Sequence, residues 1–286
     1  MWINRTETHI FLLKGGLFFL GLYFSFLPLE AQKKSVQSHG RGYESYIVKA
    51  SGISFQAFDY DLSRQPLRAC YFGTDAKSKY DAWKRRYKRR VLCYFAVGFA
   101  EQNDRPLGIS AENGTSLNRN WEQSMDGLIQ VDAYGKLTFA DLERERVAQR
   151  YDLKSPSDRS RFMRQLPRSR GSIFQTQLMY SHLDGRKMGP EKYGERASRR
   201  FMAVCRDKGG HVHYIILEQP KSMHLNKAAV GAIACLSSVG YEILYLFNHD
   251  TGSRNVMQAF DLKEKRLYRS PMELSKATQL LVFYVP

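Results

Sequence analysis

The chain has 286 residues, and its 44 lysines and arginines against 28 acidic residues give a formal net charge of +16. Hydrophobic residues make up 43% and aromatic residues 13%, which is enough for a full core and excludes a disordered, collagen-like or coiled-coil chain. The positive charge favours anionic partners, among them nucleic acids, phosphorylated glycans and anionic membrane surfaces.

The N-terminal residues predict export. An apolar run of fifteen residues, Gly15–Leu29, follows the basic residues Arg5 and Lys14. This length fits the core of a signal peptide and falls short of the roughly 20 residues that a membrane span needs. We therefore expect a signal peptide over 1–31, cleaved after Ala31, and a secreted or periplasmic protein. A retained N-terminal anchor is the alternative.

Four cysteines lie in the remaining chain and form no CxxC pair: Cys70, Cys93, Cys205 and Cys235. This spacing does not suggest a metal site, so we expect neither a metal nor a cofactor. Export permits disulfides, and four cysteines allow three complete pairings. The sequence does not choose between disulfides and buried free thiols.

The mature chain is predicted to begin with a flexible lead-in, residues 32–52, and to continue as one domain over 53–286. Short runs rich in Val, Ile, Phe and Tyr, separated by Gly, Asn and Asp, are typical of strands. The expected strands are Tyr46–Lys49, Ile53–Tyr60, Val91–Gly98, Leu107–Glu112, Gly127–Val131, Lys136–Phe139, Ser172–Tyr180, Phe201–Arg206, His211–Leu217, Ile243–Asn248, Val256–Asp261 and Leu280–Val285. Glycine-containing turns are expected at Asp132–Gly135 and Asp207–Gly210.

Three helical segments are expected. Lys77–Arg90 is a basic helix, and Leu142–Arg170 is an arginine-rich excursion that starts as a helix and continues as a proline-containing surface segment. Asn226–Val239 is apolar on most faces, which indicates a buried helix. With the strands Tyr214–Leu217 and Glu242–Phe247 on either side, it forms a βαβ-like unit. The sequence thus predicts an α+β fold of mixed, mostly antiparallel β-sheets with a few packed helices, including one βαβ-like unit near the C-terminus.

Five short motifs follow one another along the domain. They are the strand end Gly98-Phe99, the segment Pro106–Gly114 (PLGISAENG), the glutamine-containing strand Gly171–Leu178 (GSIFQTQL), the arginine segment Arg199–Val204 (RRFMAV) and the segment Asn248–Ser253 (NHDTGS). In this order the chain resembles the phosphodiester glycosidase family over most of its mature length. The resemblance implies an enzyme that hydrolyses the bond between a sugar and a phosphate.

The motifs also depart from the family pattern. The family's first strand ends in a motif like NGGFF, of which only Gly98-Phe99 remains, and Thr251 stands where the last motif has a glycine. Lost glycines change how closely the backbone approaches a ligand, and the lost asparagine removes a side chain that both donates and accepts hydrogen bonds. Two alternatives stay open. One is an active exported hydrolase, and the other is a catalytically inactive relative that binds an anionic glycan or envelope polymer through a basic surface.

The resemblance also implies a site around the last motif. Cleavage of a glycosyl phosphodiester needs a carboxylate near the sugar and cationic or amide donors near the phosphate. The expected catalytic residues are Asp250, with Glu112 or Asp126 as its partner, and His249 as an acid. The expected substrate-binding residues are Arg200, Asn248, Gly252, Ser253, Arg254 and Gly108. On sequence alone, Asp250 is equally a turn residue, His249 a structural residue and Arg200 part of a solvated basic surface.

The basic helix is a second candidate source of function. Lys77–Arg90 holds eight lysines and arginines against one aspartate, interleaved with Tyr80, Trp83 and Tyr87. Such a surface suits a polyanion. Export disfavours nucleic acid, which leaves phosphorylated glycans, envelope polymers and a peripheral contact with a membrane surface. The alternative is a solvated helix whose aromatic side chains pack on the core.

Overall fold

The computed structural model describes residues 34–186 and 195–286, so the expected signal peptide over 1–31 lies outside the described residues. All of the described residues belong to one structural unit. Within them, none of the helices combines the length and the apolar character that crossing a bilayer requires.

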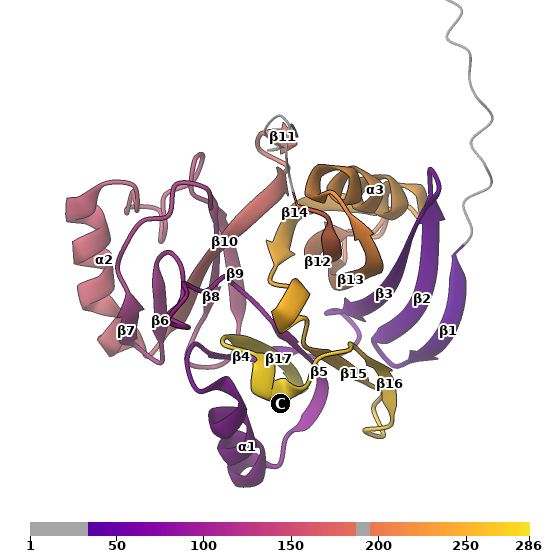
Figure 1. Ribbon diagram of the computed structural model, residues 1–286, viewed down its shortest axis with the longest axis horizontal. Helices are drawn as coiled ribbons and strands as arrows, with labels where there is room; N and C mark the ends of the chain where they lie inside the picture. The colour runs from indigo at the N-terminus through magenta and orange to yellow at the C-terminus, as the bar shows by residue number, and fades with distance from the viewer. Residues whose placement is uncertain (1–33, 187–194) are drawn as a thin grey trace, which may run out of the picture. The chain divides into compact units, whose positions relative to one another are not determined.

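Two antiparallel sheets form the framework of the described chain (Figure 1). The larger sheet has the strand order β1-β2-β3-β13-β12-β14-β10-β6-β7, with β8, β9 and β11 joined to it through β10 and β8. Its strands are β1 (Ser35–Gly40), β2 (Tyr43–Ala50), β3 (Ile53–Asp61), β6 (Ser110–Glu112), β7 (Thr115–Asn118), β8 (Gly127–Val131), β9 (Leu137–Asp141), β10 (Ser172–Ser181), β11 (Gly185–Arg186), β12 (Ala197–Arg206), β13 (Val212–Met223) and β14 (Glu242–His249). The smaller sheet has the order β16-β15-β5-β17-β4. Its strands are β4 (Arg68–Phe72), β5 (Arg90–Ala96), β15 (Met257–Phe260), β16 (Arg266–Arg269) and β17 (Leu280–Val285).

The main hydrophobic core lies between the two sheets. Strands of the larger sheet contribute Phe58, Met202 and Phe247, and strands of the smaller sheet contribute Phe95 and Phe283. The last two rings meet edge to face, with their centroids 5.6 Å apart. Burial of large aromatic side chains from both faces is the main force that holds the sheets together.

The βαβ-like unit is confirmed, in a split form. The helix α3 (Leu225–Ser238) connects β13 to β14, but β12 lies between these two strands and is antiparallel to both. The connected strands are therefore parallel without being neighbours. The helix packs closely on the larger sheet, because an added Cβ at Gly231 would lie only 2.6 Å from Ile53 Cδ1.

Residues 142–170 fold differently from the expectation. The segment begins with turns, and the helix α2 (Pro156–Ser169) comes after them. The side chain of Ser155 caps the helix by accepting a hydrogen bond from the backbone N–H of Asp158, and Pro156 occupies the first turn. Proline is well tolerated there, since its missing N–H would have no partner within the helix. Pro156, which was expected to follow the helix, therefore starts it.

Residues 34–52 are more ordered than the flexible lead-in that the sequence predicts, since they form β1 and β2, and only Tyr46–Lys49 among them was expected as a strand. Strands β1 and β2 pair with each other, and β2 pairs with β3 along its whole length. Tyr46 and Val48 are fully buried, in the hydrophobic cluster that also contains the inner face of α3. This part of the chain is an edge of the larger sheet, and its alternating burial pattern is that of a strand with one face on the core.

The cysteines are free thiols in the structure, and three of them, Cys93, Cys205 and Cys235, are buried. Burial raises the pKa of the Cys93 thiol to about 12. A buried thiol that stays protonated is a poor nucleophile, so these cysteines serve packing.

Candidate functional site

The segment 248–254 leaves the larger sheet at the carboxyl end of β14, a strand flanked by β10 and β12. Its first residue, Asn248, is 2% exposed. Its side-chain Nδ2 donates to Gln177 Oε1 at 2.7 Å, and its backbone oxygen accepts from Thr176 Oγ1 at 2.7 Å. Asn248 therefore fixes the start of the segment to β10 and does not face a ligand.

Arg200 is fully buried, which corrects the idea of a solvated basic surface. On β12 it stands opposite Glu218 of β13, and its Nε donates to that carboxylate. Its Nη1 donates to the backbone oxygens of Val256 at 2.9 Å and Asp250 at 3.4 Å, and its Nη2 donates to Asn255 Oδ1. All three nitrogens of the guanidinium are engaged within the protein, so Arg200 positions the segment around Asp250 and does not contact a phosphate directly.

His249 is also buried, at 1% exposure, and packs on Phe95 with ring centroids 5.4 Å apart. Burial, reinforced by the charge of Arg200, lowers the pKa of His249 to about 3. The imidazole is therefore neutral at physiological pH. This position gives His249 a packing role and does not suit the expected role as a general acid.

Asp250 has the environment of a functional carboxyl group. Its side chain is 16% exposed and lies 3.9 Å from Arg254, measured from Oδ2 to Nη1. Burial raises the pKa of Asp250 to about 6, although Arg254 and Arg200 both act to lower it. Arg254 also donates from Nη2 to Asp104 Oδ1 at 2.6 Å. The Arg254 guanidinium thus lies between the largely buried carboxylate of Asp250 and that of Asp104, which is 70% exposed.

A cavity of about 860 Å³ lies next to this pair. The short 3₁₀ turn Gly252–Arg254 places Ser253 and Arg254 on its wall. The other walls are Thr74-Asp75, the loop Asn103–Arg105 and residues 272–278. Three cations, Arg105, Arg254 and Lys276, and two carboxylates, Asp75 and Asp104, line the cavity, and Arg254 connects it to Asp250. Its size is within the range of small-molecule sites, and its cations suit an anionic ligand.

Gly108 belongs to the support of the site. Gln175 is fully buried, and its Oε1 accepts from the backbone N–H of Ile109 at 3.0 Å while its Nε2 donates to the backbone oxygen of Glu122 at 2.8 Å. A Cβ at Gly108 would lie 2.7 Å from Gln175 Oε1, and the backbone has φ +77°. Glycine at this position therefore allows the glutamine to join two loops.

Substitution of Gly108 by alanine should reduce the free energy of unfolding by about 2–4 kcal/mol, from the strained φ together with the clash with a side chain that cannot move away. Gly210→Ala is the matched control, since Gly210 has φ +81° and nothing within 4 Å of an added Cβ. It should lose only about 1 kcal/mol. Urea unfolding of both variants measures the difference, and equal losses would contradict the clash.

Glu112 is engaged elsewhere. It is 7% exposed, and its Oε2 accepts from the backbone N–H of Gly73 at 2.9 Å and from Lys79 Nζ at 2.7 Å. These contacts fix the turn before α1 (Ala76–Tyr87), a turn that continues into the cavity wall at Thr74. Glu112 thus supports the cavity wall through this turn, and it does not line the cavity itself.

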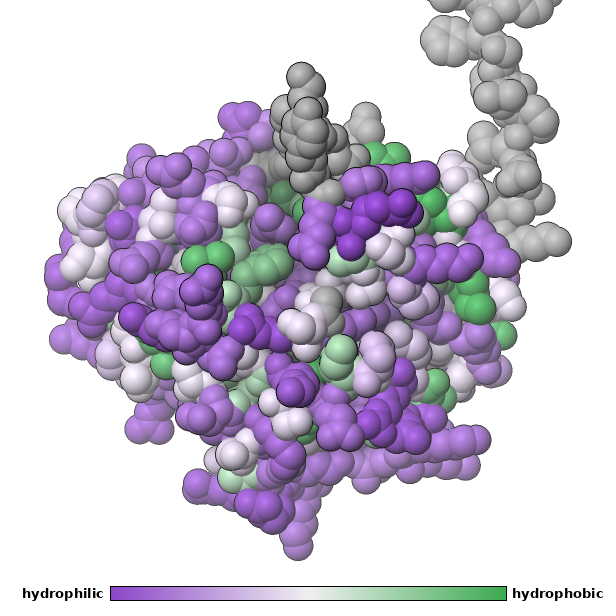
Figure 2. All heavy atoms as spheres, viewed as in Figure 1, coloured by the Kyte–Doolittle hydropathy of each residue, from purple (hydrophilic) through white to green (hydrophobic). Residues whose placement is uncertain are grey.

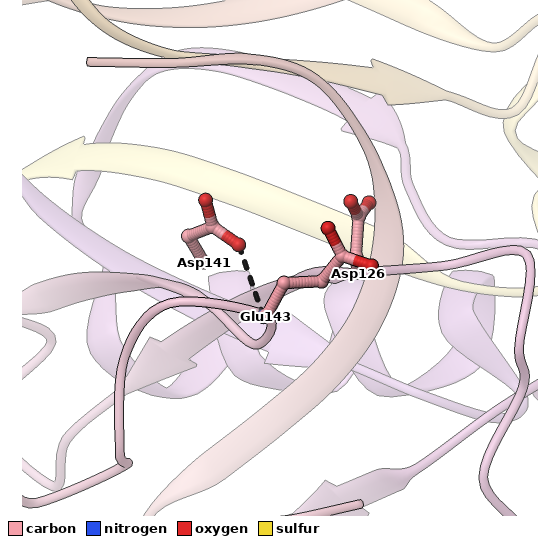
Figure 3. A group of neighbouring side chains, drawn as sticks. All are labelled: Asp126, Asp141 and Glu143. Atoms are coloured by element: carbon pink, nitrogen blue, oxygen red, sulfur yellow. Dashed lines mark hydrogen bonds between the residues drawn. The ribbon is translucent and has the colours of Figure 1, made fainter. Parts of the chain in front are cut away.

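A separate group of carboxylates, Asp126, Asp141 and Glu143, lies around the start of β8 and the end of β9 (Figure 3). One oxygen from each lies within 4.8 Å of the others, and oxygen ligands of this kind suit Mg²⁺ or Ca²⁺. Hydrogen bonds within the protein engage this group, however. Asp126 Oδ1 accepts from the backbone N–H of Leu178 at 3.2 Å, and Asp141 Oδ1 accepts from the backbone N–H of Glu143 at 3.0 Å. These hydrogen bonds engage one oxygen each of Asp126 and Asp141.

Sequence reasoning missed several residues of the site. Asp104 and Arg105 lie in the loop between β5 and β6, and Lys276 lies in the short turn before β17. These loops contain no motif that marks them. Asn255 follows the predicted motif directly, is 4% exposed and donates from Nδ2 to Ser198 Oγ at 3.1 Å as well as accepting from Arg200. Its place directly after the motif is the one sequence feature that points to it.

Comparison with known proteins gives distant likenesses. No model of a known protein family matches the chain, and no curated protein matches it. The catalytic domain of zebrafish N-acetylglucosamine-1-phosphodiester alpha-N-acetylglucosaminidase, auto-inhibited by its pro-peptide, is similar with a TM-score of 0.49 and 13% identity over 90% of this chain and 88% of that one. A hypothetical protein from Synechocystis is similar with a TM-score of 0.47 and 12% identity over 90% of this chain and 68% of that one. At such low sequence identity, the chemistry of the site has to be argued from this chain's own residues.

Proposed function

We propose that the chain is a hydrolase that cleaves a glycosyl phosphodiester in the cavity beside Asp250. The observation that carries the proposal is the pair of Asp250 and Arg254. Burial raises the pKa of Asp250 to about 6, and Arg254 connects this carboxyl group to the wall of a cavity that holds three cations and two carboxylates. Carboxyl groups with perturbed pKa values next to a cavity are candidates for catalysis. The order of the sequence motifs supports the same substrate class.

The residues divide between the two halves of such a substrate. The carboxylate of Asp250 stabilises positive charge at the anomeric carbon as the bond from that carbon to the phosphate oxygen breaks. The electron pair of the bond stays with the phosphate, whose charge Arg254, Arg105 and Lys276 stabilise. Water adds to the anomeric carbon and gives its proton to the departing phosphate or to Asp250. Because phosphate is a good leaving group, no strong general acid is needed, which agrees with a neutral, buried His249.

The test is a panel of substrates that differ only at the anomeric substituent. Methyl phosphodiesters of glucose, N-acetylglucosamine and mannose are compared with the methyl glycosides of the same sugars, and phosphorus NMR follows conversion of the diester to the monoester. We expect release of sugar from at least one diester and a rate on the glycosides at least about a hundredfold lower, since the cationic wall then has nothing to bind. Cleavage of the glycosides at an equal rate would contradict the proposal.

The activity should depend on the ionisation of Asp250. A carboxyl group that works as the anion is inactive when protonated, so kcat/KM should rise with pH through about 6 and level off above it. Arg254→Gln removes the charge that lowers this pKa most and should shift the rise to higher pH. A rate that falls as pH increases through this range would instead make Asp250 a proton donor and would overturn its assigned role.

Export is part of the proposal, and the apolar run Gly15–Leu29 supports it. Sequencing the N-terminus of the protein purified from the cells that produce it checks this directly. A start at Gln32 is expected, and a start at Met1 would show a retained segment. The alternative function, a catalytically inactive protein that binds an anionic glycan, predicts no sugar release from any diester together with retained binding of the polymer.

A further inference from the structure

A second cavity, of about 360 Å³, lies at the C-terminal end of α1. The aromatic side chains of Trp83, Tyr87 and Tyr284 line it together with Arg89. Trp83 lies 6.1 Å from Tyr87 and 5.1 Å from Tyr284, measured between ring centroids. The three rings form a continuous aromatic wall that a ligand in the cavity would contact.

This wall is only partly explained by the core. Tyr80, one turn earlier on the same face of α1, is 6% exposed and packs on Tyr94. Trp83 is half-buried, and Tyr87 is 49% exposed. The aromatic face of the helix therefore runs from the core out to solvent. The expectation that these residues pack on the core holds for Tyr80. The Tyr87 ring is half exposed and the Arg86 guanidinium lies over it, 5.2 Å from its centroid, which leaves apolar surface for a ligand to cover.

The charges of α1 are divided in the same way. Lys77, Lys79 and Lys84 form ion pairs with Asp81, Glu112 and Glu264 at 2.7, 2.7 and 3.0 Å. The later cations, Arg85, Arg86, Lys88, Arg89 and Arg90, are all exposed, and among the described residues none of them has an ion pair with a carboxylate. Figure 2 shows the hydrophilic surface over the part of the molecule where α1 lies in Figure 1. Of these five cations, Arg89 lines the aromatic cavity, and Arg86 lies over the Tyr87 ring, 5.2 Å from its centroid.

We propose that this cavity binds a sugar ring of a phosphodiester-linked glycan, at a place distinct from the Asp250 cavity. The apolar face of a sugar ring stacks on the rings of Trp83 and Tyr87, while Arg89 in the cavity and the exposed cations beside it on the chain bind the flanking phosphates. Asn113 and Asp132 also line the cavity and offer polar atoms to the sugar hydroxyl groups. The proposal rests on the substrate class proposed above and does not depend on catalysis.

The two cavities lie at opposite ends of one helix. Residues Thr74-Asp75, just before α1, line the Asp250 cavity, and Tyr87, the last residue of α1, lines the aromatic cavity. A helix of 12 residues is about 18 Å long. A polymer with several sugar phosphate units can reach both cavities at once, so the aromatic cavity holds the chain while its end is in the other site. Once a polymer is bound in one cavity, its next units are at a high effective concentration near the other. The protein should therefore bind polymers more tightly than single sugar phosphates.

Calorimetric titration of the full-length Asp250→Asn protein tests the proposal, because this variant binds the probe without consuming it. The probe is a synthetic tetramer of glucose units joined by phosphodiester bridges. Comparison ligands are the neutral glucose tetramer, inorganic polyphosphate of similar charge, single-stranded oligothymidylate and vesicles of phosphatidylglycerol. We expect the probe to bind at least about tenfold more tightly than each of these. Tighter binding of any comparison ligand would overturn the proposed ligand class. Polyphosphate would then indicate recognition of charge alone, oligothymidylate a nucleic acid, and the vesicles a membrane surface.

Variants on the same background locate the binding. Tyr87→Ala should weaken the probe about tenfold, as loss of a stacking ring does in other aromatic sites, and Tyr87→Phe, which keeps the ring, should bind normally. Arg89→Gln should weaken binding of the probe several-fold. It should also reduce the dependence of the binding constant on salt concentration by the amount that corresponds to about one phosphate contact. Arg164→Gln, which changes an exposed arginine of α2 outside the cavity, is the control. Normal binding of the probe by Tyr87→Ala would overturn the proposed sugar site, whether or not the wild type is active. If the wild type binds the probe but releases no sugar, the proposed sugar site stands and the proposed catalytic function is refuted.

Discussion

Replacement of Asp250 by asparagine is expected to reduce sugar release from a glycosyl phosphodiester by at least about a thousandfold, because the amide has the shape of the carboxylate without its charge. Asp104→Asn is the matched control. Asp104 contacts the same arginine at 2.6 Å but is 70% exposed, so its loss should change the rate only a few-fold. Single-turnover assays of both variants measure the effect on the chemical step. Equal rates for wild type and Asp250→Asn would exclude this residue from the mechanism.

The same substitution should make the protein more stable at neutral pH. Burial raises the pKa of Asp250 from 3.8 to about 6, so the folded state binds a proton more tightly than the unfolded state does. The destabilisation by the charged carboxylate is therefore absent below about pH 4 and complete above about pH 6. Asp250→Asn should increase the free energy of unfolding by roughly 1–3 kcal/mol at about pH 7 and by little at about pH 4. Lower stability of the variant at neutral pH would contradict the burial of this charge.

Loss of Arg200 is expected to cause the largest loss of stability in the molecule. Arg200→Met leaves the fully buried carboxylate of Glu218 without its cation, and it removes the donors that hold Val256 and Asn255. Removing one partner of a buried pair costs about 3–5 kcal/mol. Urea unfolding measures this, and Arg206→Met is the control on the same strand, where an exposed pair with Glu242 contributes about 1 kcal/mol or less.

A double substitution separates the charge from the packing. Arg200→Met with Glu218→Leu removes both charges, and an apolar pair of similar volume often restores stability. We expect the double variant to be more stable than Arg200→Met while remaining inactive, since the backbone oxygen of Asp250 has lost its contact with the guanidinium. A double variant with normal activity would show that Arg200 does not position Asp250. A double variant no more stable than Arg200→Met would show that the loss comes from packing.

Much of the framework could be predicted because its strands are strongly patterned. Strand β8 begins and ends at the predicted residues, Gly127 and Val131, and the turn Asp132–Gly135 connects it to β9 as expected. The βαβ-like unit could be predicted because the apolar segment of α3 lies between two short strand-like runs. What the pattern could not indicate is that β12 inserts between β13 and β14, because strand order depends on contacts between residues far apart in the sequence.

The candidate site was predictable in part. Asp250 and Arg254 lie together beside a cavity, and Asp250 is partly buried as a functional carboxyl group would be. The role of Arg200 was not predictable from its neighbours, since Arg199 beside it is half-buried and Arg200 fully buried. The available signal was Glu218, a charged residue that directly follows an apolar strand run and therefore needs a cation when buried.

The order of strands in the smaller sheet has a consequence for how the chain folds during synthesis. Strand β17 (Leu280–Val285) lies between β4 and β5 and pairs with both of them. The ribosome makes β4 and β5 early, and until residues 280–285 emerge these two strands have no partner between them. Until then the edges of β4 and β5 that pair with β17 stay open, and unpaired strand edges are prone to aggregate or to need a chaperone.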